Sequence, residues 1–143
     1  MNLDELKLDV HTDLKIDSEH LDTESLKNQE IKAKYLDVKS RYELLLFKAK
    51  GDYKRIYRDK WEYYGGKADA KIYVSKPFDI KVLKTDLSVY ITSDQDVIDA
   101  ENKIGYLETV VDYIKGVIKS VDNRGWDIKN AIEWKKFEAG VTY

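Results

Sequence analysis

Residues 53–66 read Tyr-Lys-Arg-Ile-Tyr-Arg-Asp-Lys-Trp-Glu-Tyr-Tyr-Gly-Gly, a stretch that interleaves aromatic rings with cations. Unpaired bases offer a π-face that stacks on Tyr or Trp, and the phosphates between them attract Lys and Arg. On a helix these side chains form two adjoining rows, one of Tyr53, Tyr57, Trp61 and Tyr64 and one of Lys50, Lys54 and Arg58. The pattern is typical of a groove for single-stranded nucleic acid. The alternative is that the rings belong to a core and the cations to its solvated rim.

Basic charge is concentrated in one part of the chain. The 143 residues include 25 basic and 27 acidic ones, so the whole molecule has no general attraction for nucleic acid. Residues 27–60 hold eleven of the bases and five of the acids, whereas residues 1–26 and 93–122 are acidic. Any nucleic-acid binding is therefore expected to be local to the basic segment.

A long helix that must position these side chains is predicted from about residue 18 to residue 64. Ile16-Asp17-Ser18 offers an N-cap, and Gly65-Gly66 offers a stop. At about 1.5 Å per residue this helix is about 70 Å long, so we expect partner helices and an elongated subunit. Its apolar residues recur at heptad spacing, with Asn28 as a polar core residue, at Leu21, Ile31, Tyr35, Val38, Tyr42, Leu45, Ala49 and Ile56.

Five cations on this helix recur every seven residues, beside the apolar seam. Cations at that position usually pair with acids on a neighbouring helix. A short amphipathic helix is predicted at residues 3–10, and its acids are one source of such partners. The five are Lys27, Lys34, Arg41, Lys48 and Arg55.

The second half of the chain predicts an irregular connection and two more helices. Residues 67–92 hold the only proline, and they fit either extended segments or a short helix near residues 86–90. A second long helix is predicted from Ser93-Asp94 to about residue 122, where Asn123-Arg124-Gly125 offers a stop, and a last helix from Asp127 to about Glu138. The fold class is mainly α, in a single domain of three parts, residues 1–66, 67–92 and 93–143.

No set of residues points to enzymatic chemistry, a cofactor or a metal. His11 and His20 are the only histidines and there is no Cys, so a zinc site is not expected. We attribute the acids at residues 94–101 to the dipole of a helix N-terminus rather than to metal binding. No signal peptide or membrane-length apolar run is present, which predicts an unexported protein without a membrane partner.

Three stretches carry a family resemblance, namely Tyr63-Tyr64-Gly65-Gly66-Lys67, Asn123-Arg124-Gly125-Trp126-Asp127-Ile128-Lys129 and Phe137-Glu138-Ala139-Gly140. They resemble the UvsY recombination mediator family of T-even-like phages, and the resemblance covers nearly the whole chain. It implies a largely helical subunit that forms a homo-oligomeric ring and binds single-stranded DNA. It further implies help for a RecA-like phage recombinase in replacing the phage single-strand-binding protein, in the cytoplasm of the infected bacterial host.

The resemblance also narrows the candidate DNA-binding residues. The family's Lys-x-Arg motif before Tyr-Tyr falls on Arg58 and Lys60, with the two cations exchanged in order. The full candidate set is Lys54, Arg55, Tyr57, Arg58, Lys60, Trp61, Tyr64 and Lys67.

Oligomerisation is expected to depend on the second long helix and the last one. The candidate residues are Ile104, Leu107, Val111, Ile114, Ile118, Trp126, Ile132, Trp134 and Phe137. The alternative function is a coiled-coil structural or chaperone protein without nucleic-acid binding, in which the rings of residues 53–64 form a protein interface.

Overall fold

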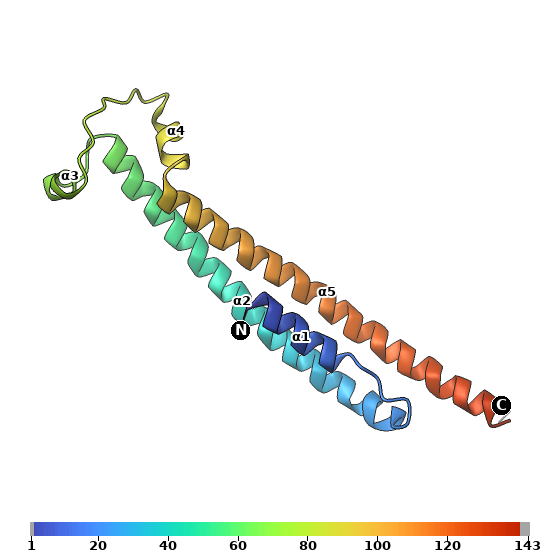
Figure 1. Cartoon of the computed structure of the whole chain (residues 1–143). Coiled ribbons are helices and arrows are strands. Elements are labelled where there is room, and N and C mark those ends of the chain that lie inside the picture. The colour runs from blue at the N-terminus through green and yellow to red at the C-terminus, as the bar shows by residue number, and fades with distance from the viewer. Residues whose placement is uncertain (1, 141–143) are drawn as a thin grey trace. The chain divides into compact units, whose positions relative to one another are not determined.

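A computed structural model describes residues 2–140, and the chain in this range is helical without strands (Figure 1). The mainly α fold class is therefore confirmed. The elements are α1 (Leu3–Asp13), α2 (Leu21–Tyr64), α3 (Ala70–Ser75), α4 (Leu87–Thr92) and α5 (Gln95–Glu138). They form two compact units, residues 1–42 with 109–143 and residues 43–108, and both units draw on α2 and α5. No described helix is long and apolar enough to cross a membrane.

The predicted N-terminal helix is present as α1, and a capping box starts it. The side chain of Asn2 accepts from the Glu5 backbone N–H at 2.8 Å, and Glu5 accepts from the Asn2 backbone N–H at 3.2 Å. Leu6 and Val10, one turn apart, are buried on one face. They join the core of the first unit with Tyr35, Val38, Val110, Ile114, Val117 and Val121.

The start of α2 was predicted three residues too early. The Asp17 carboxylate accepts from the Glu19 backbone N–H at 3.0 Å and lies 2.8 Å from His20 Nδ1. These bonds stabilise a turn before the helix rather than its first amides, because Asp side chains favour local turns as readily as caps. The first helical residue is Leu21, and α2 then runs to Tyr64.

Most of the predicted heptad seam on α2 faces inward. Tyr35 and Ala49 are 0% and 3% exposed, whereas Leu45 is 49% exposed and is not a core residue. The predicted pairing of cations with a neighbouring helix is confirmed for Lys34, whose ammonium lies 3.1 Å from Asp9 and 2.7 Å from Asp13 of α1. Lys27 and Arg55 instead pair with acids one turn earlier on α2 itself.

The predicted stop at Asn123-Arg124-Gly125 is wrong, and α5 continues through it to Glu138. Arg124 is only 3% exposed, and its guanidinium donates to the backbone oxygens of Leu14, Lys15 and Glu24. It also donates to Asn28 Oδ1 at 3.0 Å and to the Glu24 carboxylate. This buried network stabilises the helix past the glycine and explains the polar core position at Asn28.

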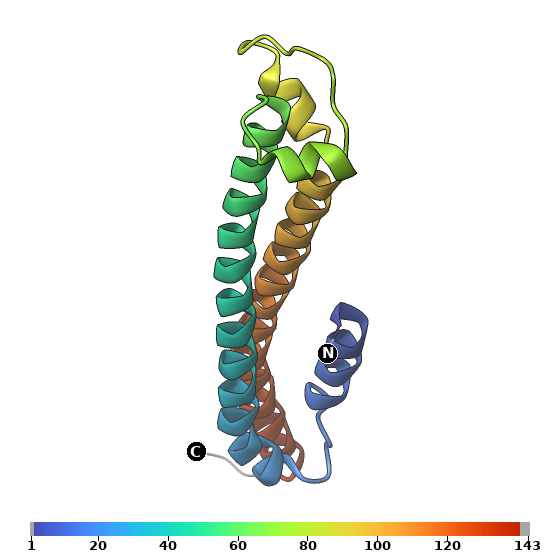
Figure 2. The same cartoon turned by 90° about the vertical axis from the view of Figure 1, so that its left-hand side faces the viewer.

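The connection at residues 67–92 contains two short helices and an extended stretch. The helix expected near residues 86–90 is confirmed as α4. Figures 1 and 2 place α3, α4 and the extended stretch together at the Tyr64 end of α2. The Tyr73 hydroxyl donates to the Tyr63 carbonyl at 2.8 Å, which ties α3 to that helix end.

Candidate nucleic-acid interface

The exposed cations of the candidate interface lie on the last turns of α2. Lys54 is exposed, and the side chains of Arg55 and Arg58 are 72% and 67% exposed. Arg55 lies 3.3 Å from Asp52 and Arg58 lies 3.6 Å from Asp59. Solvent-exposed pairs of this kind contribute little, so both guanidinium groups remain available to a phosphate.

Trp61 is the aromatic residue of this surface, and Lys67 lies against its ring. Trp61 is 41% exposed, and the Lys67 ammonium lies 4.6 Å from its ring centroid, within cation–π range. The helix end creates this contact. Gly66 has φ of +74°, its N–H donates to Tyr63, and the Lys67 N–H donates to the Glu62 carbonyl at 2.8 Å. This Schellman motif turns the chain back over the helix and brings the lysine to the indole.

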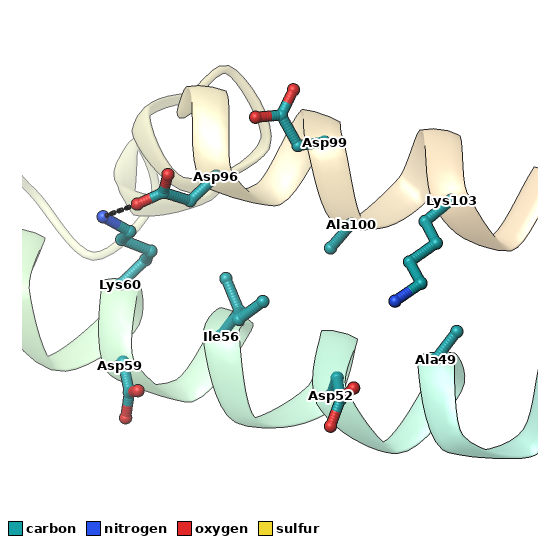
Figure 3. Close-up of a pocket in the computed structure, with 9 residues that line it drawn as sticks. All are labelled: Ala49, Asp52, Ile56, Asp59, Lys60, Asp96, Asp99, Ala100 and Lys103. Atoms are coloured by element: carbon teal, nitrogen blue, oxygen red, sulfur yellow. Dashed lines mark ion pairs between the residues drawn. The ribbon is translucent and has the colours of Figure 1, made fainter. Parts of the chain in front are cut away.

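Lys60, in contrast, is held within the chain. Its ammonium lies 2.8 Å from Asp96 (Figure 3). It also lies 3.5 Å from Asp94, and its side chain is only 17% exposed. Burial by itself lowers the pKa of Lys60, but the two carboxylates outweigh it and leave the pKa raised. The structure therefore places this half of the Arg58/Lys60 motif in an intramolecular ion-pair cluster.

Tyr64 belongs to the same cluster. Its hydroxyl donates to Asp94 at 2.6 Å, and burial together with this bond raises its pKa. Its ring packs at 5.0 Å against Phe78 and at 5.8 Å against Tyr90. Tyr57 is half-buried, with its ring 6.0 Å from Tyr53. The contacts of Tyr57 and Tyr64 therefore agree better with aromatic residues that pack within the chain than with residues that stack on bases.

The acids that hold Lys60 and Tyr64 were predicted to serve only the helix dipole. Asp94 does accept from the Asp96 backbone N–H at 2.9 Å at the start of α5. The additional contacts join residues about 30 or more positions apart in sequence, and no periodic signal links them. Only the pairing of α2 with α5 reveals them.

A cavity of about 500 Å³ lies beside this cluster, between α2 and α5 within the second unit. Figure 3 shows Lys60 pointing from α2 to Asp96, and Lys103 pointing from α5 toward α2. Four of its nine lining residues are Asp, so the cavity is unsuited to phosphate. Among residues 2–140, no group of His, Cys, Asp or Glu is arranged to hold a metal ion.

The predicted oligomerisation residues divide into three groups, which differ in burial. Leu107, Val111 and Ile114 are buried within the chain itself, and Ile118 packs against the core of the first unit. Ile104 and Ile132 are half-buried. The remaining three are exposed aromatics of the C-terminal third of α5, namely Trp126 at 63%, Trp134 at 60% and Phe137 at 70%.

Comparisons with known proteins agree on one family. Residues 9–141 match the family described as "Recombination, repair and ssDNA binding protein UvsY". The chain is 26% identical over 140 residues to "Recombination protein uvsY" of Enterobacteria phage T4, covering 98% of this chain and 99% of the relative.

Solved structures show the same fold. The crystal structure of the bacteriophage T4 recombination mediator protein UvsY in lattice type II has a TM-score of 0.84 and 24% identity, covering 97% of this chain and 98% of that one. The lattice type I structure has a TM-score of 0.82 and 22% identity, covering 94% and 98%.

Proposed function

Because the chain belongs to the UvsY family of recombination, repair and single-stranded DNA-binding proteins, we propose that it is a recombination mediator. In this role it binds single-stranded DNA and promotes loading of a RecA-like recombinase onto DNA covered by a single-strand-binding protein. Its action is non-enzymatic and consists of binding and exchange. The phage T4 relative is itself called a recombination mediator protein in the names of its solved structures.

The observation that carries the proposal is the exposed cation row at the end of α2. Arg58 and Arg55 present guanidinium groups to solvent, about one and two helical turns before the exposed indole of Trp61. In the proposed complex, Lys54, Arg55 and Arg58 contact phosphates and Trp61 stacks on a base. Lys67, over the indole, reaches the same strand.

Lys60 and Tyr64 act indirectly in this proposal. Their contacts with Asp94 and Asp96 fasten the end of α2 to the start of α5, which fixes the helix that presents Arg58. Both are positioning residues rather than DNA contacts. Tyr57 is half-buried and contributes through packing with Tyr53.

We further propose that subunits associate through the exposed aromatics of α5, Trp126, Trp134 and Phe137. The rings of Trp134 and Phe137 stack on each other with centroids 5.5 Å apart. Aromatic side chains with a large exposed area favour protein interfaces. A ring of subunits repeats the cation row, and this avidity offsets the acidic balance of the chain.

The experiment that tests DNA binding is a salt titration with fluorescent oligo-dT. Arg58→Ala is expected to weaken binding and to flatten the dependence of log K on log salt by about 0.7 for each phosphate that is no longer neutralised. Lys115→Ala, at an exposed cation of α5, is the matched control, and it is expected to leave the affinity and the salt dependence unchanged. Equal affinity and slope for Arg58→Ala and wild type would remove Arg58 from the site.

Mediator activity is tested separately, by recombinase filament assembly on oligonucleotides covered by single-strand-binding protein. The wild-type chain is expected to shorten the lag before filament assembly. With the Arg58→Ala variant, the lag is expected to be as long as without the chain. A wild-type chain that binds DNA but leaves the lag unchanged refutes the mediator function and leaves the binding function intact.

A further inference from the structure

Residues 77–83, between α3 and α4, form an extended segment with an unpaired backbone. Throughout residues 2–140, no protein group hydrogen-bonds to the N–H groups of residues 78–83 or to the carbonyls of residues 77–82. The carbonyl of Leu83 is used, since it accepts from the Asp86 N–H at 2.9 Å. A row of open donors and acceptors on an extended chain is the surface to which another strand adds.

The segment packs against the end of α2. Side chains alternate along a strand, so a strand conformation would place Phe78, Ile80 and Val82 on one face. Phe78 and Val82 are half-buried, and residues 78–82 line a cavity of about 360 Å³ together with residues 64–66. The Phe78 ring lies 5.0 Å from the Tyr64 ring. This packing supports the segment on its face and leaves its hydrogen-bonding edges open.

The sequence of the segment is complementary to itself in the antiparallel direction. When Ile80 is placed opposite Ile80 of a second copy, Asp79 faces Lys81 and Phe78 faces Val82. Opposite charges and apolar pairs directly across an antiparallel ladder stabilise it. The same pairs form twice, once on each side of the centre, as a two-fold contact between identical chains requires.

We propose that residues 77–83 pair with the same segment of a second copy of this chain, as an antiparallel ribbon centred on Ile80. The backbone N–H and C=O groups of Phe78, Ile80 and Val82 form the hydrogen-bonded ladder with the second copy. The opposite edge includes Pro77, which has no N–H to donate. An acidic peptide or a nucleic acid would be attracted by the flanking lysines but repelled by Asp79. A second copy satisfies both signs of charge, and the pairing does not depend on DNA binding.

Cysteine trapping tests the register, because the wild-type chain has no Cys. A two-stranded ribbon alone is only marginally stable, so a covalent readout is needed. In the proposed register, positions 79 and 81 of different copies form the close, non-hydrogen-bonded pair. A mixture of Asp79→Cys and Lys81→Cys chains with different tags is expected to give a disulfide-linked heterodimer, more than either variant alone. Val74→Cys on α3, at a residue 83% exposed, is the control for random collision.

Charge reversal tests the same contact without cross-linking. Asp79→Lys and Lys81→Asp are each expected to lower the average mass in sedimentation, and the double exchange in one chain is expected to restore it. Helical content by circular dichroism verifies that each variant is folded. A heterodimer yield no higher than that of the Val74→Cys control overturns the proposal. A Lys81→Asp chain with unchanged mass but weaker oligo-dT binding overturns it as well and makes the segment a nucleic-acid contact.

Discussion

The ammonium group of Lys60 lies 2.8 Å from Oδ2 of Asp96, whereas the guanidinium of Arg58, two residues earlier, faces solvent. Two cations of one short motif therefore have different environments on the same helix. One is fixed by carboxylates at the start of α5, and the other is open to a ligand.

This difference predicts that substitutions at the two positions have separable effects. Lys60→Ala leaves Asp94 and Asp96 without their cation, and it is expected to lower the free energy of unfolding by about 1 kcal/mol. Arg58→Ala removes an exposed side chain and is expected to change stability by less than about 0.5 kcal/mol while weakening oligo-dT binding. Urea unfolding and fluorescence anisotropy of both variants measure the two effects. Equal loss of stability in both variants would contradict the assignment.

Arg124 is expected to be the most sensitive position in the first unit. Arg124→Ala leaves the buried Glu24 carboxylate with only the Lys27 ammonium, at 3.5 Å, and breaking a buried ion pair typically costs about 3–5 kcal/mol. Urea unfolding measures the loss, with Lys119→Ala, at an exposed position of the same helix, as the control. Because an apolar replacement of both partners is often tolerated, Arg124→Met combined with Glu24→Leu is expected to recover part of the lost stability. If the free energy of unfolding of Arg124→Ala is within about 0.5 kcal/mol of the wild-type value, Arg124 does not stabilise the first unit in this way.

Substitution of the exposed aromatic residues at the end of α5 is expected to weaken the association of subunits. Trp134→Ala combined with Phe137→Ala is expected to give smaller species in sedimentation with little change in helical content, because neither side chain belongs to the core. Deleting the chain after Asn123 is a poorer test, since it removes Arg124 and the buried Ile128. Ser120→Ala, at an exposed site on the same helix, is the control. An unchanged sedimentation coefficient for the double variant shows that subunits meet elsewhere.

Stability is expected to fall in acid through Asp94. Its burial favours the neutral form, but the hydrogen bond from Tyr64, the Asp96 N–H and Lys60 together keep the pKa of its carboxyl below the usual value. A lowered folded-state pKa contributes stability that is present above the unfolded pKa of about 3.9 and is lost as the pH falls through the folded pKa. Urea unfolding across about pH 2–7 tests this. Asp94→Asn should show a shallower loss in acid, and the exposed Asp112→Asn should retain the wild-type profile.

The sequence predicted the helices where local signals and periodicity agree. The Gly65-Gly66 stop and the seam through Tyr35 and Ala49 need no knowledge of distant residues. Asn123-Arg124-Gly125 has the composition of a stop as well. There, a guanidinium bound by residues about 100 positions earlier overrides the local preference of the glycine.

The sequence predicted which residues make up the candidate site, but not which of them are exposed and which are held by other parts of the chain. Heptad spacing and the family resemblance identified the basic turns of α2, and the cations on them are largely exposed. Neither signal could separate Lys60 from Arg58, because the acids that hold Lys60 lie at the start of another helix. Likewise, the oligomerisation prediction combined residues that fill the chain's own core with residues that remain exposed.

In the proposed complex, the contact of Lys67 with Trp61 makes base stacking an exchange rather than an addition. The Lys67 ammonium lies over the indole, so a base that stacks on that face of the ring displaces it, and we expect the lysine then to contact the adjoining phosphate. The indole reports this exchange optically, because its emission depends on what lies against its ring. In a chain whose two other tryptophans are changed to Phe, quenching on addition of oligo-dT would follow a single position.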